Sequence, residues 1–240
     1  MDKILIDTMH VEETKKMTKA EEKRLLSAEK VRVKLEAERD RLKEMRIYEE
    51  KYSDYELICG VDEVGRGPLA GPVFTAAVIL PKDCEILYLN ESKKLSEKKR
   101  EELFLEISEK ALAIGIGSCS PEEIDTLNIK QATRKAMLQA VQNLELQPGI
   151  VLVDAETITG LNIRQVPIIK GDAKSVSIAA ASIVAKVTRD HLMIEYDKIY
   201  PQYGFASNKG YGSATHMQAL KLYGPCPIHR RSFIKNIVSD

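Results

Sequence analysis

The sequence predicts an α/β domain that follows a charged helical extension. From about residue 52 onward, short apolar runs alternate with helical patterns, and glycine and proline separate them. Such alternation is typical of strands connected by helices. The 240 residues are 44% apolar and 30% charged, so the chain can bury a sizeable core, which argues against a wholly disordered protein. Its length suits one globular domain and an extra segment.

Each expected element rests on a local pattern. Apolar runs predict strands at residues 56–61, 72–80, 112–118, 150–153 and 165–169. Helical patterns predict helices at residues 97–111, from 121 to about 144, 175–198 and 213–222. Pro121 suits a first helical turn, where its missing amide would have no partner in any case. Pro167 indicates an edge strand or a bulge, because proline cannot donate to the ladder of a sheet.

The extension is expected to form one long helix. Residues 11–51 are dense in Lys, Arg and Glu and contain no Gly or Pro, so we place the domain boundary between residues 1–51 and 52–240. Sparse apolar side chains could line one stripe of this helix: Leu25, Leu26, Val31, Val33, Leu35, Leu42, Met45 and Ile47. Either the helix is solvated and packs loosely on the domain, or it is an arm that grips a nucleic acid or a partner helix. Its mixed charge argues against a strong electrostatic grip.

Charge and cysteine content limit the functional classes. Lys and Arg total 36, as do Asp and Glu, which excludes a uniformly basic coat for nucleic acid but not a local basic face. No run approaches the roughly 18 apolar residues of a spanning helix, and the N-terminus is too short and too acidic for a signal peptide. The four cysteines form no CxxC pair, so we expect reduced thiols, no structural zinc and a cytoplasmic protein with no membrane association.

Acidic residues follow several of the expected strands. Asp62 and Glu63 end the first strand, before the turn-forming residues 65–68, while Asp154 and Asp172 follow later strands. Neighbouring side chains of a strand point to opposite faces, so Asp62 and Glu63 would share a site only if the chain turns there. Each acid alone could simply cap a turn or a helix. Together they would repel one another unless cations lie among them.

The chemistry of such a cluster is that of a hard divalent ion. Oxygen ligands favour Mg²⁺ or Mn²⁺ over zinc or copper. Two such ions about 4 Å apart are a common device for phosphodiester hydrolysis. A dinucleotide site is disfavoured, because the run GRGPLAG lacks the GxGxxG spacing and leads into a strand.

Five segments of the chain resemble sequence motifs of one enzyme family, and they occur in the same order as in that family. They are GVDEVGRGPLAGPV, NESKKLSEKKRE, VLVDA, KGDAKSVSIAAASIVAKVTRD and GYGSATH, and they cover nearly all of residues 55–230. Together they are similar to ribonuclease HII, the type 2 ribonuclease H. The resemblance implies a ribonuclease H-like fold with a central mixed β-sheet flanked by helices. It also implies a monomeric endonuclease that cuts the RNA strand of RNA–DNA hybrids and single ribonucleotides embedded in duplex DNA.

The resemblance assigns roles residue by residue. It implies that four carboxylates hold Mn²⁺ or Mg²⁺, with two ions per site: Asp62, Glu63, Asp154 and Asp172. It implies that Gly65, Arg66 and Gly67 read the ribose 2′-hydroxyl, and that Tyr211 stacks near the junction between ribonucleotide and deoxyribonucleotide. The products would carry 5′-phosphate and 3′-hydroxyl ends.

Two departures from related patterns bear on the assignment. Ribonuclease HIII typically has lysine between the two glycines and a larger N-terminal domain with a sheet, so Arg66 favours the HII family. Glu91 stands where the family usually has Asp, which leaves its role open.

The C-terminal third is a candidate surface for the nucleic acid. Residues 164–240 hold 11 Lys and Arg against 5 Asp and Glu. We expect phosphate contacts from lysines in or near the motifs: Lys93, Lys94, Lys170, Lys174, Lys186 and Lys209. Ser175 is expected to cap the following helix, whose first amides would favour a phosphate. Asp190 is left out of the metal site, because the helix would separate it from Asp172 by roughly 27 Å. A protein that binds hybrids without cutting them remains the alternative, although it would not need the acids.

Overall fold

The computed structural model describes residues 18–238, which form two compact units, one ending at Asp40 and one beginning at Arg41. Helix α1 spans Lys19–Glu44, so its last residues belong to the second unit. Within the first unit α1 exposes more than half of the surface of Leu25, Leu26, Val31 and Val33, the first residues of the expected apolar stripe. Residues 11–17 of the expected helix lie outside the described residues.

A five-stranded mixed sheet forms the centre of the second unit. Its strands are β1 (Ile58–Val64), β2 (Val73–Ile79), β3 (Ala113–Cys119), β4 (Ile150–Asp154) and β5 (Arg164–Ile168). They lie in the order β3-β2-β1-β4-β5. The pairs β1–β2 and β2–β3 are antiparallel, whereas β1–β4 and β4–β5 are parallel. This confirms the mixed sheet, and the carboxyl ends of β1 and β4 therefore lie side by side.

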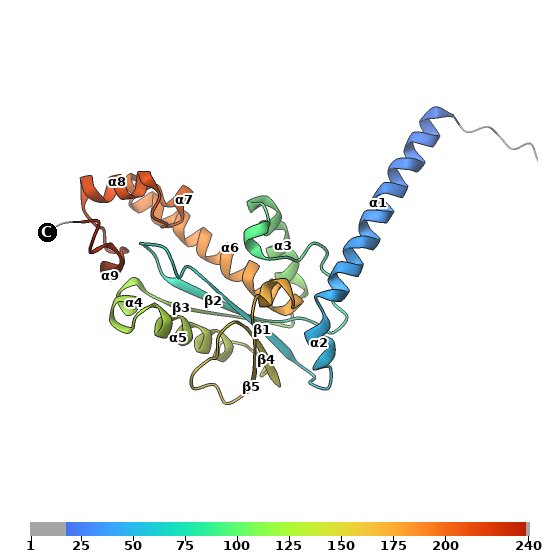
Figure 1. Ribbon diagram of the computed structural model, residues 1–240, viewed down its shortest axis with the longest axis horizontal. Coiled ribbons are helices and arrows are strands. Elements are labelled where there is room, and N and C mark those ends of the chain that lie inside the picture. Colours follow the sequence, from blue (N-terminus) through green and yellow to red (C-terminus); the bar gives the residue numbers. More distant parts are fainter. Residues whose placement is uncertain (1–17, 239–240) are drawn as a thin grey trace, which may run out of the picture. The chain divides into compact units, whose positions relative to one another are not determined.

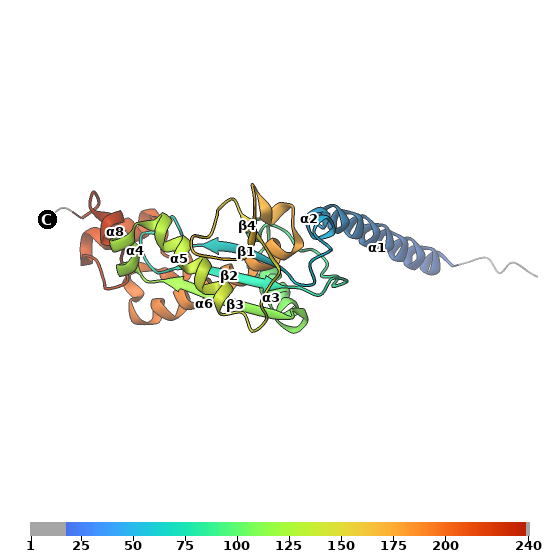
Figure 2. The same ribbon diagram turned by 90° about the horizontal axis from the view of Figure 1, so that it is seen from below.

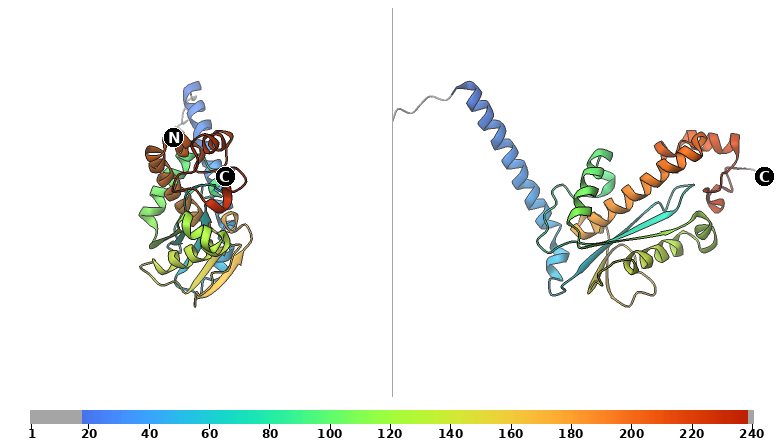
Figure 3. Two further views of the ribbon diagram at one scale, coloured as in Figure 1. Left: turned by 90° about the vertical axis from the view of Figure 1, so that its left-hand side faces the viewer. Right: turned by 180° about the vertical axis from the view of Figure 1, so that it is seen from behind.

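Helices cover both faces of the sheet. Figures 1 and 2 show α3 (Glu97–Lys110) and α6 (Val176–Ile199) on one face, and α4 (Pro121–Leu127) and α5 (Ile129–Gln142) on the other. The same two layers are seen from behind in Figure 3. The remaining short elements are α2 (Ile47–Lys51), α7 (Phe205–Asn208), α8 (Ala214–Tyr223), α9 (Arg231–Ile234) and the 3-10 turns Ser92–Lys94, Gly171–Ala173 and Pro201–Tyr203.

Close contact between helix and sheet is built from small residues. A Cβ added to Gly60 of β1 would lie 2.1 Å from the backbone of Ser177 in α6. A Cβ added to Gly117 of β3 would lie 2.0 Å from the carbonyl oxygen of Ala136 in α5. Interiors are packed as densely as organic crystals, so these helices can approach the sheet only where a side chain is missing.

The expected elements are found, with two breaks that the sequence patterns did not predict. The helix expected from residue 121 to about 144 is divided at Asn128, whose φ of 67° and ψ of 159° are not helical. Its side chain there accepts hydrogen bonds from the amides of Lys130 and Gln131 and so caps α5. The extension is likewise interrupted between α1 and α2. Pro167 lies in β5, the edge strand, as predicted.

Among residues 18–238, no helix combines the length and the apolar character needed to span a bilayer.

Candidate active site

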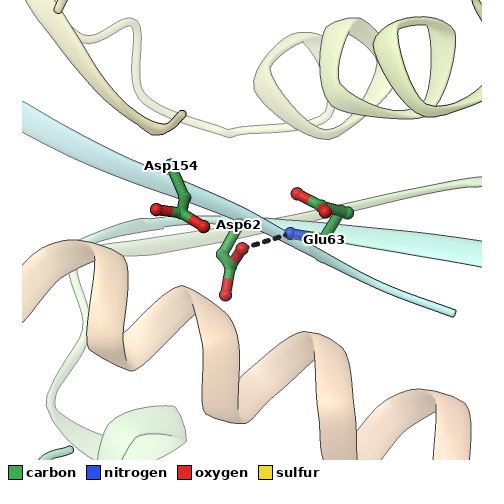
Figure 4. Close-up of side chains that lie close together, drawn as sticks. All are labelled: Asp62, Glu63 and Asp154. Atoms are coloured by element: carbon green, nitrogen blue, oxygen red, sulfur yellow. Dashed lines mark hydrogen bonds between the residues drawn. The ribbon is translucent and has the colours of Figure 1, made fainter. Parts of the chain in front are cut away.

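Three carboxylates meet where β1 and β4 run side by side. Val61 pairs with Val153, so Asp62 and Asp154 are the next residues along two neighbouring parallel strands. One oxygen from each of Asp62, Glu63 and Asp154 lies within 4.8 Å of the others. Figure 4 shows the three side chains around a common space above α6. The strand order therefore brings together acids that are about ninety residues apart in the chain.

The two carboxylates share the site although the chain does not turn between them, and the turn-forming residues 65–68 come only after the strand has ended. Strand β1 continues through both residues, which pair with Ala76 and Thr75 of β2. The Asp62 side chain lies along the strand, where its Oδ1 accepts a hydrogen bond of 2.7 Å from the amide of the next residue, Glu63. This conformation keeps the two carboxylates close although their Cβ atoms point to opposite faces of the sheet.

The site strongly disfavours negative charge in the absence of a cation. Burial raises the pKa of Asp62 well above its usual range, and the charge of Glu63 raises it further. A hydrogen bond from Ser182 of α6 acts in the opposite direction. Burial also raises the pKa of Glu63, while the guanidinium of Arg66, 3.5 Å from Glu63 Oε1, lowers it. Buried, crowded carboxylates of this kind fit a divalent cation, which neutralises them and accepts oxygen ligands.

Asp172 lies beside this cluster but outside the closest set. It stands in the 3-10 turn after β5, and its pKa is raised by burial and then by the charges of Asp154 and Glu91. Lys93 acts in the opposite direction. The turn is tied to the cluster, because the amide of Gly171 donates a 2.6 Å hydrogen bond to Asp154 Oδ1. The fourth predicted acid thus faces the same region.

The loop after β1 is held by an arginine that the sequence analysis did not single out. Arg230 donates to the carbonyl oxygens of Gly65 (2.6 Å), Arg66 (2.9 Å) and Gly71 (2.9 Å). Its side chain is fully buried, and burial lowers its pKa to about 9. Nothing in its sequence context distinguishes it from the neighbouring Arg231, which is exposed.

A second buried arginine holds the far side of the same loop. Arg189 of α6 donates to the carbonyl oxygens of Pro72 (3.0 Å), Ala70 (3.1 Å) and Lys209 (2.9 Å). It lies within one of the matched motifs, but the motif gives no sign of its burial. Together, Arg189 and Arg230 fix the backbone that presents Arg66 to solvent.

Tyr211 lies next to this loop with its ring partly exposed. Its relative exposure is 45%, and a Cβ added to Gly67 would lie 3.8 Å from the ring. A buried histidine pair holds its backbone, since His216 Nδ1 lies 2.8 Å from the Tyr211 carbonyl oxygen and His216 Nε2 lies 2.9 Å from His229 Nε2. The amide of Cys226 donates to His229 Nδ1, so His229 bears its proton on Nε2 and His216 bears its proton on Nδ1.

Some of the lysines expected to contact phosphates are exposed, whereas others are bonded to groups of the protein itself. Exposed lysines are Lys93, Lys94, Lys170 and Lys174, of which Lys94 pairs with Glu91 at 2.5 Å. Lys209 Nζ donates to the carbonyl oxygen of Ala206. Lys186 is 17% exposed and pairs with Asp190 at 2.7 Å, so its charge is used within the protein.

Ser175 caps α6 as expected, but it is fully buried. Its hydroxyl donates to Glu49, and the amide of Ser177 donates to the same carboxylate. A protein side chain thus occupies the position where we expected a phosphate, so we assign Ser175 to helix capping and not to substrate binding.

Comparisons of this chain with known protein families, sequences and structures agree with this geometry. The family model described as ribonuclease HII matches residues 59–236. The ribonuclease HII of Lachnoclostridium phytofermentans is 66% identical over 206 residues, covering 86% of this chain and 81% of the relative. The ribonuclease HII of Acetivibrio thermocellus is 57% identical over 212 residues, covering 88% of this chain and 83% of the relative. The crystal structure of ribonuclease H2 from Pyrococcus horikoshii superposes with a TM-score of 0.65 at 26% identity, covering 75% of this chain and 96% of that one.

A mixed five-stranded sheet with carboxylates clustered at the ends of its central strands defines a metal-dependent nuclease of the ribonuclease H-like class. Within that class, the chain belongs to the ribonuclease HII family. It is therefore a metal-dependent ribonuclease that acts on nucleic acid. The alternative of a binding protein without catalysis is not supported, because the relatives are ribonucleases and all four acids are present.

Proposed function

We propose that this ribonuclease hydrolyses the RNA strand of RNA–DNA hybrids and also cuts at single ribonucleotides embedded in duplex DNA, leaving 5′-phosphate and 3′-hydroxyl ends. The observation that carries the proposal is the approach of Asp62, Glu63 and Asp154 within 4.8 Å, beside Asp172. The four carboxylates and the loop at Gly65–Gly67 all lie within one chain, so the proposed site would need no second copy to complete it, in keeping with a monomer.

The four carboxylates would hold two Mn²⁺ or Mg²⁺ ions. When bound, such ions supply an activated water and stabilise the leaving oxygen. The part of the protein is to present oxygen ligands in a buried setting: Asp62 is fixed by the amide of Glu63, and Asp154 by the amide of Gly171. Because both acids are already oriented, little reorganisation is needed when the ions arrive.

Recognition of ribose would rest on the loop at Gly65, Arg66 and Gly67. A 2′-hydroxyl can both donate and accept hydrogen bonds, so backbone groups can read it without reading the base. Gly67 is exposed and has no side chain to hold a sugar away from the backbone. Tyr211, adjacent to Gly67, offers a flat ring for stacking on the neighbouring nucleotide.

The nucleic-acid backbone would be held by the basic groups around the cluster. Arg66 is exposed beside Glu63, where its guanidinium could make bidentate hydrogen bonds to a phosphate. The exposed lysines Lys93, Lys170 and Lys174 lie on the turns and loops next to Asp172 or on its own turn. Such contacts add affinity and position the duplex without reading its sequence.

The test is cleavage of a duplex that contains one ribonucleotide, and of a continuous hybrid, by the Asp154→Asn variant. We expect a folded protein whose activity with Mn²⁺ or Mg²⁺ falls at least about a hundredfold, since a lost metal ligand removes several kcal/mol of transition-state stabilisation. Asp83→Asn, the same change at an exposed carboxylate, should cut normally. A fully active Asp154→Asn protein, or wild-type cleavage that persists in chelator, would contradict the proposal.

A further inference from the structure

The N-terminus of α6 receives part of its cap from its own residues. The first four amides of a helix have no acceptor within the helix. Here the amide of Ile178 donates to Ser175 Oγ at 3.2 Å, and the amide of Ala179 donates to the Ser175 carbonyl at 2.9 Å. These are the two bonds that a serine cap ordinarily supplies.

The other two amides are satisfied by residues that precede the whole sheet in the chain. The amide of Val176 donates to the carbonyl oxygen of Met45 at 3.2 Å. The amide of Ser177 donates to Glu49 Oε1 at 3.0 Å. A carboxylate is favourable at this end of a helix because the unpaired amides carry partial positive charge. The segment around α2 therefore completes the cap of α6.

Glu49 is also connected to the metal site through a short series of hydrogen bonds. It accepts a 2.5 Å hydrogen bond from Ser175 Oγ, and the amide of Ser175 donates to the carbonyl oxygen of Gly171 at 2.9 Å. The amide of Gly171 in turn donates to Asp154 at 2.6 Å. The 3-10 turn that carries Asp172 is thus held between Asp154 on one side and the Glu49–Ser175 pair on the other.

The same segment, residues 41–51, also contacts the loop at Leu89, which precedes the turn Ser92–Lys94. Arg41 Nη2 donates to the carbonyl oxygen of Leu89 at 2.6 Å. Residues of this segment, from 41 to 48, also line a cavity of about 570 Å³ together with Lys94 and Lys174. Contacts with both the start of α6 and the loop at Leu89 favour a role in the geometry of the site over a role as a passive linker.

We propose that Glu49 is a positioning residue of the metal site: by fixing Ser175 and the start of α6, it holds Asp172 where it can serve the bound ions. The inference rests on the proposed function, because it takes the four acids to be ion ligands. One further observation supports it. Glu49 Oε2 is buried without a hydrogen-bond partner among the described residues, a cost in stability that a purely structural cap would not need.

The experiment measures Mn²⁺ binding in the absence of nucleic acid, by the electron paramagnetic resonance signal of unbound Mn²⁺ in titrations of the full-length protein. Loss of a group that orients a ligand typically weakens metal affinity by about 10–100-fold, so we expect Glu49→Ala to bind Mn²⁺ at least about tenfold more weakly. Glu49→Gln retains the acceptor oxygen and should stay within about threefold of wild type. In cleavage assays, Glu49→Ala should lose kcat at low Mn²⁺ and regain it at high Mn²⁺, with the KM for the duplex unchanged.

The control is Ser120→Ala, which removes the capping box of α4 and so weakens a helix cap on the other face of the sheet. It should lower the melting temperature without changing Mn²⁺ affinity. Wild-type affinity in Glu49→Ala, or equal weakening in Ser120→Ala, would overturn the inference. If Glu49→Ala does not fold, Glu49→Asp takes its place. This variant keeps the charge on a shorter side chain, and it too should bind Mn²⁺ at least about tenfold more weakly than the wild type.

Asp154→Asn, titrated in parallel, separates this inference from the proposed function. If Asp154→Asn loses Mn²⁺ binding while Glu49→Ala retains it, only the role of Glu49 is wrong. If Asp154→Asn binds Mn²⁺ like the wild type, the metal site itself is misassigned and both proposals fail.

Discussion

The two glycines of the loop after β1, Gly65 and Gly67, have different reasons for lacking a side chain. Gly65 adopts a φ of 90°, and a Cβ there would lie 2.3 Å from Arg189 Nε. Gly67 has no such constraint, since a Cβ added there would have the Tyr211 ring, 3.8 Å away, as its nearest neighbour. Packing therefore favours glycine at position 65, whereas at position 67 the structure leaves space, which the proposed contact with a ribose would use.

Gly67→Ala should consequently separate binding from stability. We expect its free energy of unfolding to stay within about 0.5 kcal/mol of wild type, because the substitution is exposed and unstrained. The KM for a ribonucleotide-containing duplex should rise, since the added methyl group holds the sugar away from the backbone. Urea unfolding and steady-state cleavage measure the two effects.

Gly65→Ala is the matched comparison for that variant. A left-handed backbone and displacement of Arg189 should cost about 1–3 kcal/mol of stability. If Gly67→Ala proved as unstable as Gly65→Ala, or left the KM unchanged, the proposed division of roles between the two glycines would be wrong.

The histidine pair gives the C-terminal region a pH-dependent stability. Burial and the charge of His216 lower the pKa of His229 to about 4, and burial lowers the pKa of His216. A base whose pKa is lowered by folding stabilises the protein above its unfolded pKa of about 6.5, and this contribution is lost as pH falls toward 4. For His229 the loss is on the order of 3 kcal/mol.

Replacing His229 should reduce that dependence. We expect urea unfolding of His229→Gln to lose less stability between pH 6.5 and 4.5 than the wild type does, because one proton-linked group is gone. His191→Gln, at an exposed histidine, should keep the wild-type slope. Identical slopes for wild type and His229→Gln would show that the pair is not buried as a neutral pair.

At the scale of the elements, α5 and α6 approach the sheet through positions without side chains. Gly117→Ala in β3 would place a methyl group 2.0 Å from the Ala136 carbonyl oxygen. We expect a loss of about 2–3 kcal/mol in unfolding free energy, the upper range for overpacking. Ser118→Ala, at the exposed neighbouring position of the same strand, should change stability by less than about 0.5 kcal/mol. Thermal unfolding of the two variants is the comparison, and equal stabilities would contradict the tight packing of α5.

Sequence patterns predicted those helices and strands that depend on neighbouring residues in the chain. The apolar runs and Pro121 located strands and helix starts, and Pro167 marked the edge strand. Asn128 was not recognised as a break, because a side chain that caps the next helix resembles any polar helical residue in a periodic pattern.

For the site, local pattern and resemblance predicted the four acids, and strand order then explained how three of them meet. Sequence could not reveal Arg189, Arg230 or Glu49, because their roles depend on backbone carbonyls and amides that are distant in the chain. Charged side chains are mostly exposed, so a pattern gives no reason to bury the two arginines or one oxygen of Glu49.

At the scale of the whole molecule, the boundary between the two compact units predicts what can be removed. Deleting residues 1–40 should lower the melting temperature less than deletion through residue 51 does, since exposed ion pairs such as Glu29–Arg32 contribute little. Deletion through residue 51 should destabilise the protein, because it also removes Glu49 and the acceptor at Met45. Calorimetry of the two truncated proteins makes the comparison, and similar melting temperatures would contradict it.

The shorter deletion also tests the two alternatives for the extension. If residues 1–40 contact phosphates, their removal should flatten the dependence of log affinity on log salt by about 0.9 per lost contact with duplex DNA. An unchanged slope would exclude such contacts and leave a solvated helix or an arm that grips a partner helix as the explanation.

The cap of α6 has a consequence for synthesis on the ribosome. Glu49 leaves the exit tunnel early, whereas its partner Ser177 follows 128 positions later. Contacts of such long sequence separation form late, after most of the chain has been translated. Nascent chains that end before α6 lack the helix that packs against β1, so we expect the acids to form a working centre only after α6 has left the ribosome.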